Sequence, residues 1–314
     1  MKKVCFFFIA LMLSTYGFCQ LSWLEKNAAF APLPPGFNVF FTNDSLDGKP
    51  NIAWYATVPI GDRRFSFTTD TTLRRRLTPL QFYAKNKQPL LVVNGTFFSF
   101  ESNQNLNVVV KDGRTLAYNV QRIKNKAGDT AAYHNDRKVK GVFGISKKRK
   151  PDIAWVIADS SDRYPMAWQQ IDSVNRNNLP NATVNFTGAK KWKMKTAIGG
   201  GPVLVQQGMV AVANEAERMF AGKAILDKHP RTLIGYTKSN ELILMVIQGR
   251  TPGIAEGATL VQAAKIMIDL GCTEALNLDG GGSSCMLING KQTITPSDKG
   301  VQRPVPAVFI VNHR

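Results

Sequence analysis

Short alternations of apolar and polar residues are the commonest pattern along this chain. Runs rich in Val, Ile, Phe, Trp and Tyr predict β-strands. The clearest runs are Ile52–Val58, Arg64–Thr68, Leu90–Val93, Leu106–Lys111 and Ile153–Ala158. Turn-forming pairs between apolar runs predict hairpins at Asp112-Gly113, Gln207-Gly208, Ser239-Asn240 and Asn289-Gly290. We therefore expect mostly β-structure.

Helical patterns are fewer, and the clearest covers Thr259–Leu270. Thr259 and Gln262 have the spacing of a capping box, and Gly271 follows where helices commonly end. Two shorter helices are predicted over Thr78–Lys87 and Pro165–Asn175. Few helices among many strands indicate an α+β fold, a single mixed domain whose β-rich core of twisted sheets carries a few flanking helices.

The first nineteen residues have the parts of an export signal. Two lysines precede the apolar run Val4–Leu13, and Gly17 and Cys19 are small residues suited to signal-peptidase cleavage. We predict a signal peptide over residues 1–19 and an exported mature protein, periplasmic or secreted. Lipid attachment at Cys19 fits less well because Phe18 is bulky. No apolar run reaches the ~18 residues of a transmembrane helix.

Beyond the signal, we divide the chain into residues 20–89, a β-rich segment expected to pack on the main domain, and residues 90–314. The polar stretch Lys124–Lys140 is expected to be a long loop inside the main domain. Cys272 and Cys285 flank a Gly-rich turn. An oxidising compartment would permit a disulfide between them, but their spacing does not show proximity, and two buried thiols are slightly favoured.

The chain is strongly basic, with 40 Lys and Arg against 22 Asp and Glu among 314 residues, a formal charge of +18. Such an excess suggests an anionic partner. Basic clusters that could contact a nucleic-acid backbone occur at Arg74–Arg76, Lys147–Lys150 and Lys190–Lys193. The export signal and the lack of a nucleic-acid-binding motif argue against that partner, so we expect solvated surface there.

The segment Ala275–Ser284 carries the strongest signal for chemistry. A buried strand is expected to end at Asp279, and three glycines follow it. Glycine allows a ligand to approach the backbone closely, so successive N–H groups can bind an anion. A carboxylate at such a turn can contact sugar hydroxyls or act as an acid or base. A tight turn alone needs only one or two glycines.

Other candidate groups also lie next to predicted strands. A second glycine triplet precedes the strand Pro202–Gln206, and Arg231 offers a planar fork of donors suited to phosphate or carboxylate. His229 is either an acid–base group or a loop residue. Glycine turns combined with arginines indicate a substrate with hydroxyls and a negative charge. The substrate-binding candidates are Asn94, Thr96, Gly199, Gly200, Gly201, Thr232, Arg250, Asn277, Gly280, Gly281, Gly282, Ser283, Ser284 and Arg303.

Five segments together resemble the phosphodiester glycosidase family. They read VVNGTFF from residue 92, AIGGGPVLV from 197, HPRTLIGYT from 229, LNLDGGGSSCM from 276 and RPVPAVFIV from 303. The resemblance implies that residues 90–314 form a phosphodiester glycosidase-like domain that cleaves sugar-1-phosphodiesters at the glycosidic bond. Thr96 and Gln248 depart from the family pattern, where a Gly and an Asp are usual.

Under this resemblance each candidate takes a role. Asp279 would activate water or support the cationic sugar centre, and Arg231, with Arg303 in second place, would hold the phosphate. Glu256 is the candidate for a second catalytic carboxylate. Both glycine triplets would line the pocket, and Asn94 and Asn277 would contact the sugar.

Two other function classes remain beside this hypothesis. Non-catalytic binding of envelope or polysaccharide phosphodiesters would use much the same residues. A serine hydrolase is disfavoured because no Gly-x-Ser-x-Gly elbow occurs. No cofactor is implied and no metal-ligand spacing stands out, so dependence on a divalent cation and the oligomeric state stay open. The expected partner is an anionic carbohydrate, either a small molecule or a glycan.

Overall fold

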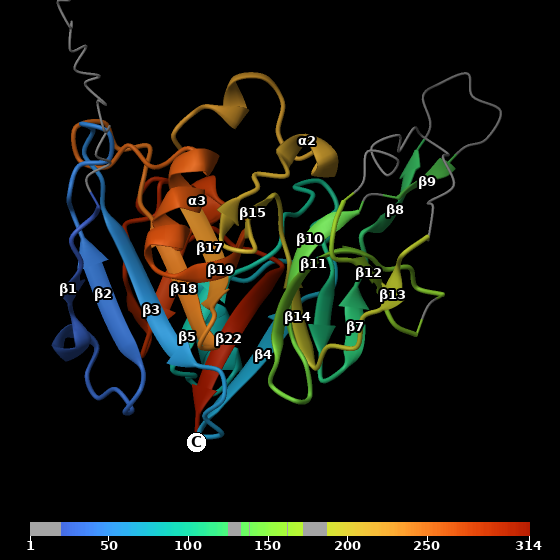
Figure 1. The fold of residues 1–314 in the computed structure, drawn as a ribbon, viewed down its shortest axis with the longest axis horizontal. Coiled ribbons are helices and arrows are strands. Elements are labelled where there is room, and N and C mark those ends of the chain that lie inside the picture. Colours follow the sequence, from blue (N-terminus) through green and yellow to red (C-terminus); the bar gives the residue numbers. More distant parts are fainter. Residues whose placement is uncertain (1–19, 125–132, 138, 162, 172–186) are drawn as a thin grey trace, which may run out of the picture.

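Three antiparallel sheets make up the body of the molecule (Figure 1). The computed structural model describes residues 20–124, 133–137, 139–161, 163–171 and 187–314. The predicted signal segment, residues 1–19, lies outside these ranges. The strand-rich, twisted architecture with few helices confirms the predicted α+β class.

The largest sheet has eight strands and carries the main helix on its outer face (Figure 1). Helix α3 (Leu260–Asp269) packs there through Leu260, Ala263, Ala264 and Met267, all of which are buried. In spatial order the strands are β1 (Leu24–Glu25), β2 (Asn38–Thr42), β3 (Ala53–Pro59), β18 (Glu241–Ile247), β17 (Arg231–Thr237), β19 (Cys272–Asn277), β15 (Val203–Gln206) and β16 (Met209–Val210).

The second sheet has seven strands, and the third has five. The seven are β13 (Lys190–Lys191), β12 (Met166–Trp168), β11 (Pro151–Ile157), β10 (Lys140–Ile145), β14 (Thr196–Gly199), β6 (Val109–Lys111) and β7 (Arg114–Ala117). The five are β21 (Lys291–Gln292), β20 (Met286–Ile288), β5 (Leu91–Asn94), β22 (Ala307–His313) and β4 (Phe65–Thr71).

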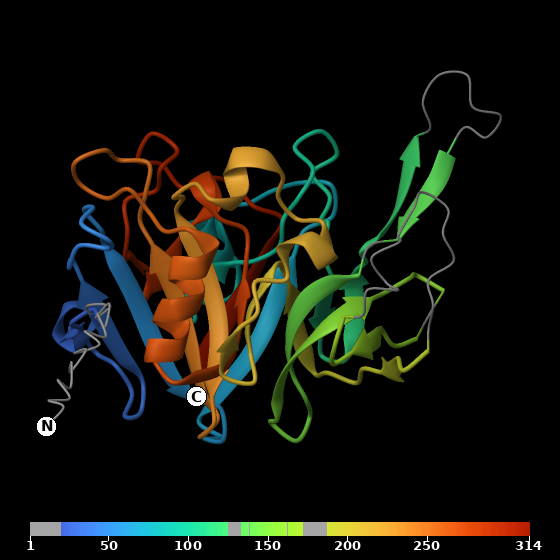
Figure 2. The ribbon, with the colours of Figure 1, turned by 45° about the horizontal axis from the view of Figure 1, so that its top comes forward.

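Smaller elements connect or flank the sheets, and Figure 2 shows the pair β8 and β9 extending away from the body. They are β8 (Val120–Lys124) and β9 (Tyr133–Arg137), the helices α1 (Pro79–Lys85) and α2 (Asn214–Glu217), and the 3₁₀ turns η1 (Asn27–Phe30), η3 (Gly222–Ile225) and η4 (Gly281–Ser283).

The central core lies where the three sheets meet. Val58 and Leu276 come from the large sheet, Phe143 from the second and Phe309 from the third, and all four are fully buried within one cluster. Burial of apolar side chains from all three sheets fixes the sheets against one another, since each loses its exposed apolar face only in this arrangement.

Most predicted elements are present. All four predicted hairpin turns are confirmed, with positive φ at Asp112, Gln207, Asn240 and Asn289. In the two-residue turns at Asp112-Gly113, Gln207-Gly208 and Asn289-Gly290, both residues have positive φ, which gives the twist that matches the flanking strands. Asn240 instead ends a three-residue loop between β17 and β18. The capping box of α3 is also confirmed by reciprocal hydrogen bonds between Thr259 and Gln262.

Two local predictions are wrong. The predicted helix Pro165–Asn175 instead contains strand β12, which pairs with β11, and its residues from 172 onward lie outside the described ranges. In the predicted loop Lys124–Lys140, residues 133–137 form β9, which pairs with β8, and residues 125–132 and 138 lie outside the described ranges. In both places pairing with a neighbouring strand decided the conformation, and a single segment's pattern does not contain that information.

The segment before residue 90 contributes strands to two sheets. Strand β3 lies between β2 and β18, and β4 pairs with β22 along its length. The division at residue 89 stays a prediction. Cys272 and Cys285 are buried free thiols, and burial raises the pKa of each to about 12.

Candidate active site

A pocket of about 260 Å³ opens where β17 begins and β19 ends. These strands are antiparallel neighbours, with Leu233 opposite Asn277. The start of one strand therefore lies beside the end of the other. The pocket is lined by Phe97, Phe220, His229, Arg231, Arg250, Asn277, Asp279, Gly280, Gly281, Gly282 and Arg303. Segments separated by up to two hundred residues meet in this one place.

Asp279 is the carboxylate of this pocket. It lies two residues after the end of β19 at Asn277, and its backbone N–H donates to Gly95 O at 2.9 Å, which fixes the start of the glycine turn. Burial raises the pKa of Asp279 to about 7, although Ser283, Arg303 and Arg250 each favour the charged form. The Ser283 hydroxyl lies close enough to the carboxylate to lower its pKa. It makes no hydrogen bond of standard geometry with any described residue. A carboxyl with this pKa can exchange a proton near neutral pH.

Three arginines are among the described residues that line the pocket with this carboxylate. Arg231 is buried, and its Nε and Nη2 donate to the carbonyls of Ala258 and Asp227 at 2.9 and 3.3 Å. Burial and the nearby Arg250 lower the pKa of Arg231 to about 10, which still leaves it charged at neutral pH. Within the described ranges, no carboxylate forms an ion pair with Arg231. Its charge is thus held in place and left available for an anion.

The other two arginines are held more loosely. Arg250 Nη2 lies 3.4 Å from His229 Nδ1, and Arg303 Nε donates to Asp298 Oδ2 at 3.0 Å. Burial, Arg231 and Arg250 lower the pKa of His229. The imidazole is therefore neutral at pH 7 and can accept a hydrogen bond from Arg250.

This turn needs glycine because the side chains of Arg250 and Arg303 pack closely against its backbone. Gly281 has φ of +58°, and a Cβ there would lie 3.0 Å from Arg250 Nη1. A Cβ on Gly282 would lie 2.2 Å from Arg303 Nη2. Only glycine lets both guanidiniums approach the backbone this closely. The triplet therefore shapes the charged wall of the pocket.

Asn277 presents an unpaired acceptor. Its Nδ2 donates to the carbonyls of Gly201 and Leu278 at 2.8 and 2.9 Å, whereas its buried Oδ1 has no hydrogen-bond partner among the described residues. Buried acceptors are normally paired. Asn277 lines the pocket, so a hydroxyl of a bound ligand is a suitable donor.

The second glycine triplet supports Asn277 from behind. Gly201 N–H donates to Asn277 O at 2.7 Å, and a Cβ on Gly200 would lie 2.3 Å from that same oxygen. Gly199 pairs with Val108 instead. None of these three glycines lines the pocket, so the structure places this triplet beneath the site.

Three residues that were predicted to contact the ligand, Asn94, Thr232 and Ser284, form a buried hydrogen-bond network beneath Asp279. Asn94 Nδ2 donates to Asp279 O at 2.6 Å, and its Oδ1 accepts from Thr232 Oγ1 at 2.8 Å and Cys285 N at 3.0 Å. Thr232 also bonds Ser284 Oγ at 3.2 Å. Asn94 is fully buried and is not among the residues that line the pocket. The structure brings these residues together as a support for the Asp279 backbone.

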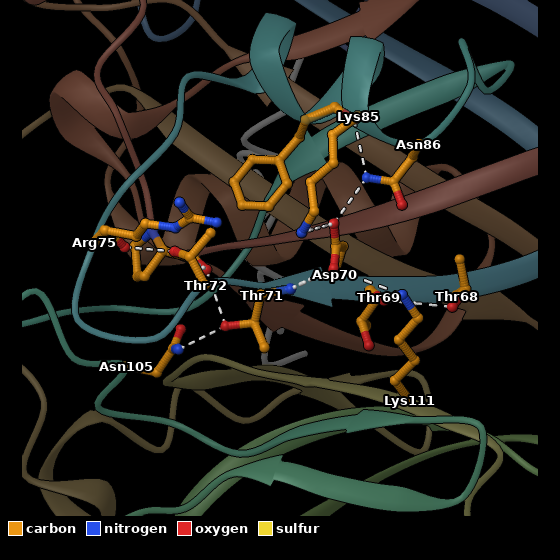
Figure 3. Close-up of polar contacts among 12 residues, drawn as sticks. Thr68, Thr69, Asp70, Thr71, Thr72, Arg75, Lys85, Asn86, Asn105 and Lys111 are labelled. Atoms are coloured by element: carbon orange, nitrogen blue, oxygen red, sulfur yellow. Dashed lines mark hydrogen bonds and ion pairs between the residues drawn. The ribbon is translucent and has the colours of Figure 1, made fainter.

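Thr96 is turned away from the pocket into a second network. Its hydroxyl bonds Asn105 Oδ1, and Asn105 Nδ2 donates to Thr71 Oγ1 at 2.9 Å. Figure 3 shows Thr71 beside Asp70, which pairs with Lys85 Nζ at 2.7 Å. Burial alone would raise the pKa of Asp70, but hydrogen bonds and charges from Lys85, Asn86 and Lys111 lower it overall. This network fixes the loop after β5.

Glu256 is not among the residues that line the pocket. Its side chain lies 4.0 Å from Lys49 Nζ, and only its backbone approaches the site, accepting from Arg250 N at 3.4 Å. Asp279 is thus the one carboxylate among the described residues that line the pocket.

Of the residues that line the pocket, the sequence left His229 open between an acid–base group and a loop residue, and it did not indicate Phe97 or Phe220. His229 and Phe97 stand inside motifs that were recognised, so their position beside chosen residues was an available signal. Phe97 and Phe220 meet edge to face with ring centroids 5.9 Å apart and form an apolar wall. Phe220 follows the turn after α2, and no sequence signal identified it.

The described ranges contain neither a cluster of metal ligands nor a membrane-spanning helix. No three His, Cys, Asp or Glu side chains there are grouped as ligands of a metal ion would be. No helix in that part of the chain is long and apolar enough to cross a membrane.

Comparisons with known proteins identify the family of this chain. A family model described as phosphodiester glycosidase matches residues 87–312. An N-acetylglucosamine-1-phosphodiester alpha-N-acetylglucosaminidase from Bos taurus is 26% identical over 102 residues, 32% of this chain and 19% of the relative. The SPbeta prophage-derived uncharacterized protein YomE of Bacillus subtilis is 33% identical over 86 residues, 27% of this chain and 13% of that protein. The chain thus spans less than a fifth of the length of these relatives.

Solved structures share the fold at low sequence identity. The zebrafish N-acetylglucosamine-1-phosphodiester alpha-N-acetylglucosaminidase catalytic domain, auto-inhibited by its pro-peptide, aligns with a TM-score of 0.63 at 20% identity, covering 94% of this chain and 89% of that one. A hypothetical protein from Synechocystis aligns with a TM-score of 0.59 at 17% identity, covering 94% and 68%. At these identities the likeness shows the fold alone.

Proposed function

Because this chain belongs to the phosphodiester glycosidase family, we propose that it hydrolyses sugar-1-phosphodiesters at the glycosidic bond, releasing a free sugar and a phosphomonoester. One observation carries the proposal: a single carboxylate whose pKa is about 7 lies in the same small pocket as three arginines. The predicted export signal places this activity outside the cytoplasm, in the periplasm or the surrounding medium.

The arginines supply the phosphate side of the site. Arg231 has a fixed guanidinium without a carboxylate partner in the described ranges, and Arg250 and Arg303 lie against the glycine turn. Negative charge grows on the phosphate as the glycosidic bond breaks. Positive groups that are already in place stabilise that charge without reorganising, and this effect is commonly the largest contribution to catalysis.

Asp279 supplies the proton transfer. In its charged form it accepts a proton from water while the water oxygen bonds to the anomeric carbon. The bond from that carbon to the phosphate oxygen breaks, and its electron pair leaves with the phosphate. The departing phosphomonoester is a weakly basic leaving group, so one carboxylate meets the main requirement. The neutral His229 lies nearby and can orient the water or the leaving oxygen.

The sugar side is formed by Asn277 and the aromatic wall. The unpaired Asn277 Oδ1 accepts from a sugar hydroxyl, and Phe97 and Phe220 cover an apolar sugar face. Asn94, Thr232 and Ser284 act indirectly by holding the Asp279 backbone.

The test is hydrolysis of a panel of sugar-1-phosphodiesters, with released sugar measured with and without a chelator. We expect the Asp279→Asn variant to lose about 10²–10⁴-fold in kcat, the usual contribution of an acid–base group. Asp62→Asn, a change at a surface carboxylate paired with Arg64, is the matched control. Activity of Asp279→Asn within tenfold of wild type would exclude the role given to Asp279.

A second candidate function is binding of envelope or polysaccharide phosphodiesters without cleavage. It is favoured by the single carboxylate of the pocket, since most glycosidases use two. The same panel separates the two functions. A binder retains the phosphodiester in equilibrium dialysis, and no free sugar appears on prolonged incubation with the wild-type protein.

A further inference from the structure

A second pocket, of about 320 Å³, lies at the other end of the strands that lead to the candidate active site. Strand β14 begins in this pocket at Thr196 and ends at Gly199, beneath the site. Strand β4 begins in it at Phe65, and the hairpin between β10 and β11 forms its rim. It lies near the end marked C in Figure 1.

This pocket is strongly and one-sidedly charged. No Asp or Glu side chain is among its described lining residues. The neighbouring Asp62 forms an ion pair with Arg64, with 2.6 Å between Asp62 Oδ2 and Arg64 Nη2. Most of the cations are exposed, and none of them forms an ion pair with a carboxylate of the described residues. The cations are Arg63, Lys147, Lys148, Arg149, Lys195 and Arg314.

Arg149 fixes one of these charges in the pocket wall. Its guanidinium donates to the carbonyls of Ile60, Asp62 and Phe65, the last two at 2.7 and 3.0 Å. Burial lowers the pKa of Arg149, and Arg63 and Arg314 lower it further against the opposing charge of Asp62. Like charges are therefore held close together, and an anion among them would relieve their repulsion.

Hydroxyl groups complete the lining. Thr196 is 2% exposed, and its Oγ1 is buried without a hydrogen-bond partner in the described part of the chain. Ser146 Oγ accepts from Lys150 N at 3.1 Å, so its own proton is free to be donated. An oxoanion accepts hydrogen bonds from hydroxyls and cations together, and so would satisfy the Thr196 group that the protein leaves unpaired.

We propose that this pocket binds a phosphate group carried by a sugar or a glycan chain. Its volume is at the lower end of the range for small-molecule sites and accommodates a phosphate with an adjoining sugar. A duplex or single-stranded nucleic acid suits it less well. The aromatic side chains in the lining, Phe65 and Phe67, are buried and offer no platform on which bases could stack.

The test uses amide chemical shifts of the whole chain, recorded during titration with α-glucose 1-phosphate, inorganic phosphate or chloride at equal ionic strength. We expect saturable shifts at Ser146, Lys147 and Thr196 with both phosphates and none with chloride. The amides of Gly280–Gly282 report the candidate active site in the same spectra. Failure at one site is therefore distinguishable from failure at the other.

Two sets of substitutions locate the binding. The triple variant Lys147→Gln, Lys148→Gln, Lys195→Gln should weaken phosphate binding at Thr196 by at least about tenfold. Thr196→Val removes only the hydroxyl and should weaken it by about threefold or more. The matched control, Lys190→Gln, Lys191→Gln, Lys193→Gln, removes equal charge from another basic cluster and should leave binding unchanged.

Three outcomes would overturn the proposal. Shifts that grow linearly and equally with chloride would show only diffuse screening. An equal loss in the control triple variant would show that net charge, and not this pocket, attracts the anion. Tighter binding of a short DNA oligonucleotide than of the sugar phosphate, with shifts centred on the same residues, would reassign the surface to nucleic acid.

Discussion

The two positively charged pockets of this molecule differ in how their charges are held. In the candidate active site, the Arg231 guanidinium is buried and fixed by backbone carbonyls, and the glycine turn brings Arg250 and Arg303 close to Asp279. In the second pocket, three lysines on an exposed hairpin and beside a strand end supply half of the positive side chains, and no Asp or Glu side chain is among its described lining residues.

That difference separates catalysis from binding. Catalysis needs charges that are already oriented before the reaction, together with a group that transfers a proton. Flexible lysines can attract and hold an anion, but they do not provide fixed orientation. We expect both pockets to bind phosphate, and we expect bond cleavage only in the candidate active site.

The largest expected effect is at Arg231. Arg231→Met removes a fixed charge from the first pocket and should lower kcat/KM for sugar-1-phosphodiesters by about 10²–10³-fold. Lys195→Met removes a charge from the second pocket and should leave kcat/KM within about twofold, because no reacting atom lies near it. Steady-state kinetics on both variants, with circular dichroism to check folding, tests this contrast. Equal losses would contradict the division into two kinds of pocket.

A steric change should give the next largest effect. Gly282→Ala places a Cβ 2.2 Å from Arg303 Nη2, so the guanidinium must move. We expect kcat/KM to fall by about tenfold or more, since misplacing a charged group costs much of its effect. Gly61→Ala, near the second pocket, meets nothing within 4 Å and is the control. A silent Gly282→Ala would show that the contact with Arg303 is dispensable.

The pH dependence should also distinguish the pockets. Asp279 acts as a base in its charged form, so kcat/KM should rise about tenfold per pH unit up to about 7 and then level. Binding of a phosphodiester in the second pocket should not change over this range, since no Asp, Glu or His side chain is among its described lining residues. Rates measured across pH 5 to 8, beside binding titrations, test this. A rate that falls with rising pH would assign Asp279 the role of an acid.

The smallest effect concerns folding stability. The folded-state pKa of Asp279 lies above the ordinary value of 3.8, so the stability linked to its protonation is present at acid pH and lost as pH rises through about 7. Asp279→Asn should therefore raise Tm at pH 8, by about 2–4 °C per kcal/mol gained. It should change Tm little at pH 4. Thermal denaturation at both pH values checks the sign, and a lowered Tm at pH 8 would contradict it.

Several parts of the fold could be predicted because they depend on neighbours in sequence. The hairpin at Asn289-Gly290 and the capping box of α3 are local interactions, and each was identified correctly. Strand β12 was not identified, because the conformation of a short apolar segment depends on whether a partner strand elsewhere in the chain pairs with it.

The same distinction applies to the candidate site. Asp279, Arg231 and the glycine triplet that follows Asp279 all line the pocket, and the sequence singled them out because unusual residue types stand together in two short motifs. Asn94 and Thr96 stand in an equally conspicuous motif, yet their side chains face buried partners. Glu256 was selected by elimination, and the loop that carries it turns its side chain toward Lys49.

The sequence by itself determined the residue types of the chemistry, the local turns and the family. It could do so because propensity, capping and motif spacing act over a few residues. The tertiary structure decided which polar side chains face the pocket and which lie beneath it, and it gathered scattered lysines and a buried threonine into a second pocket. Those outcomes depend on how three sheets pack around one core, and that packing is a property of the whole chain.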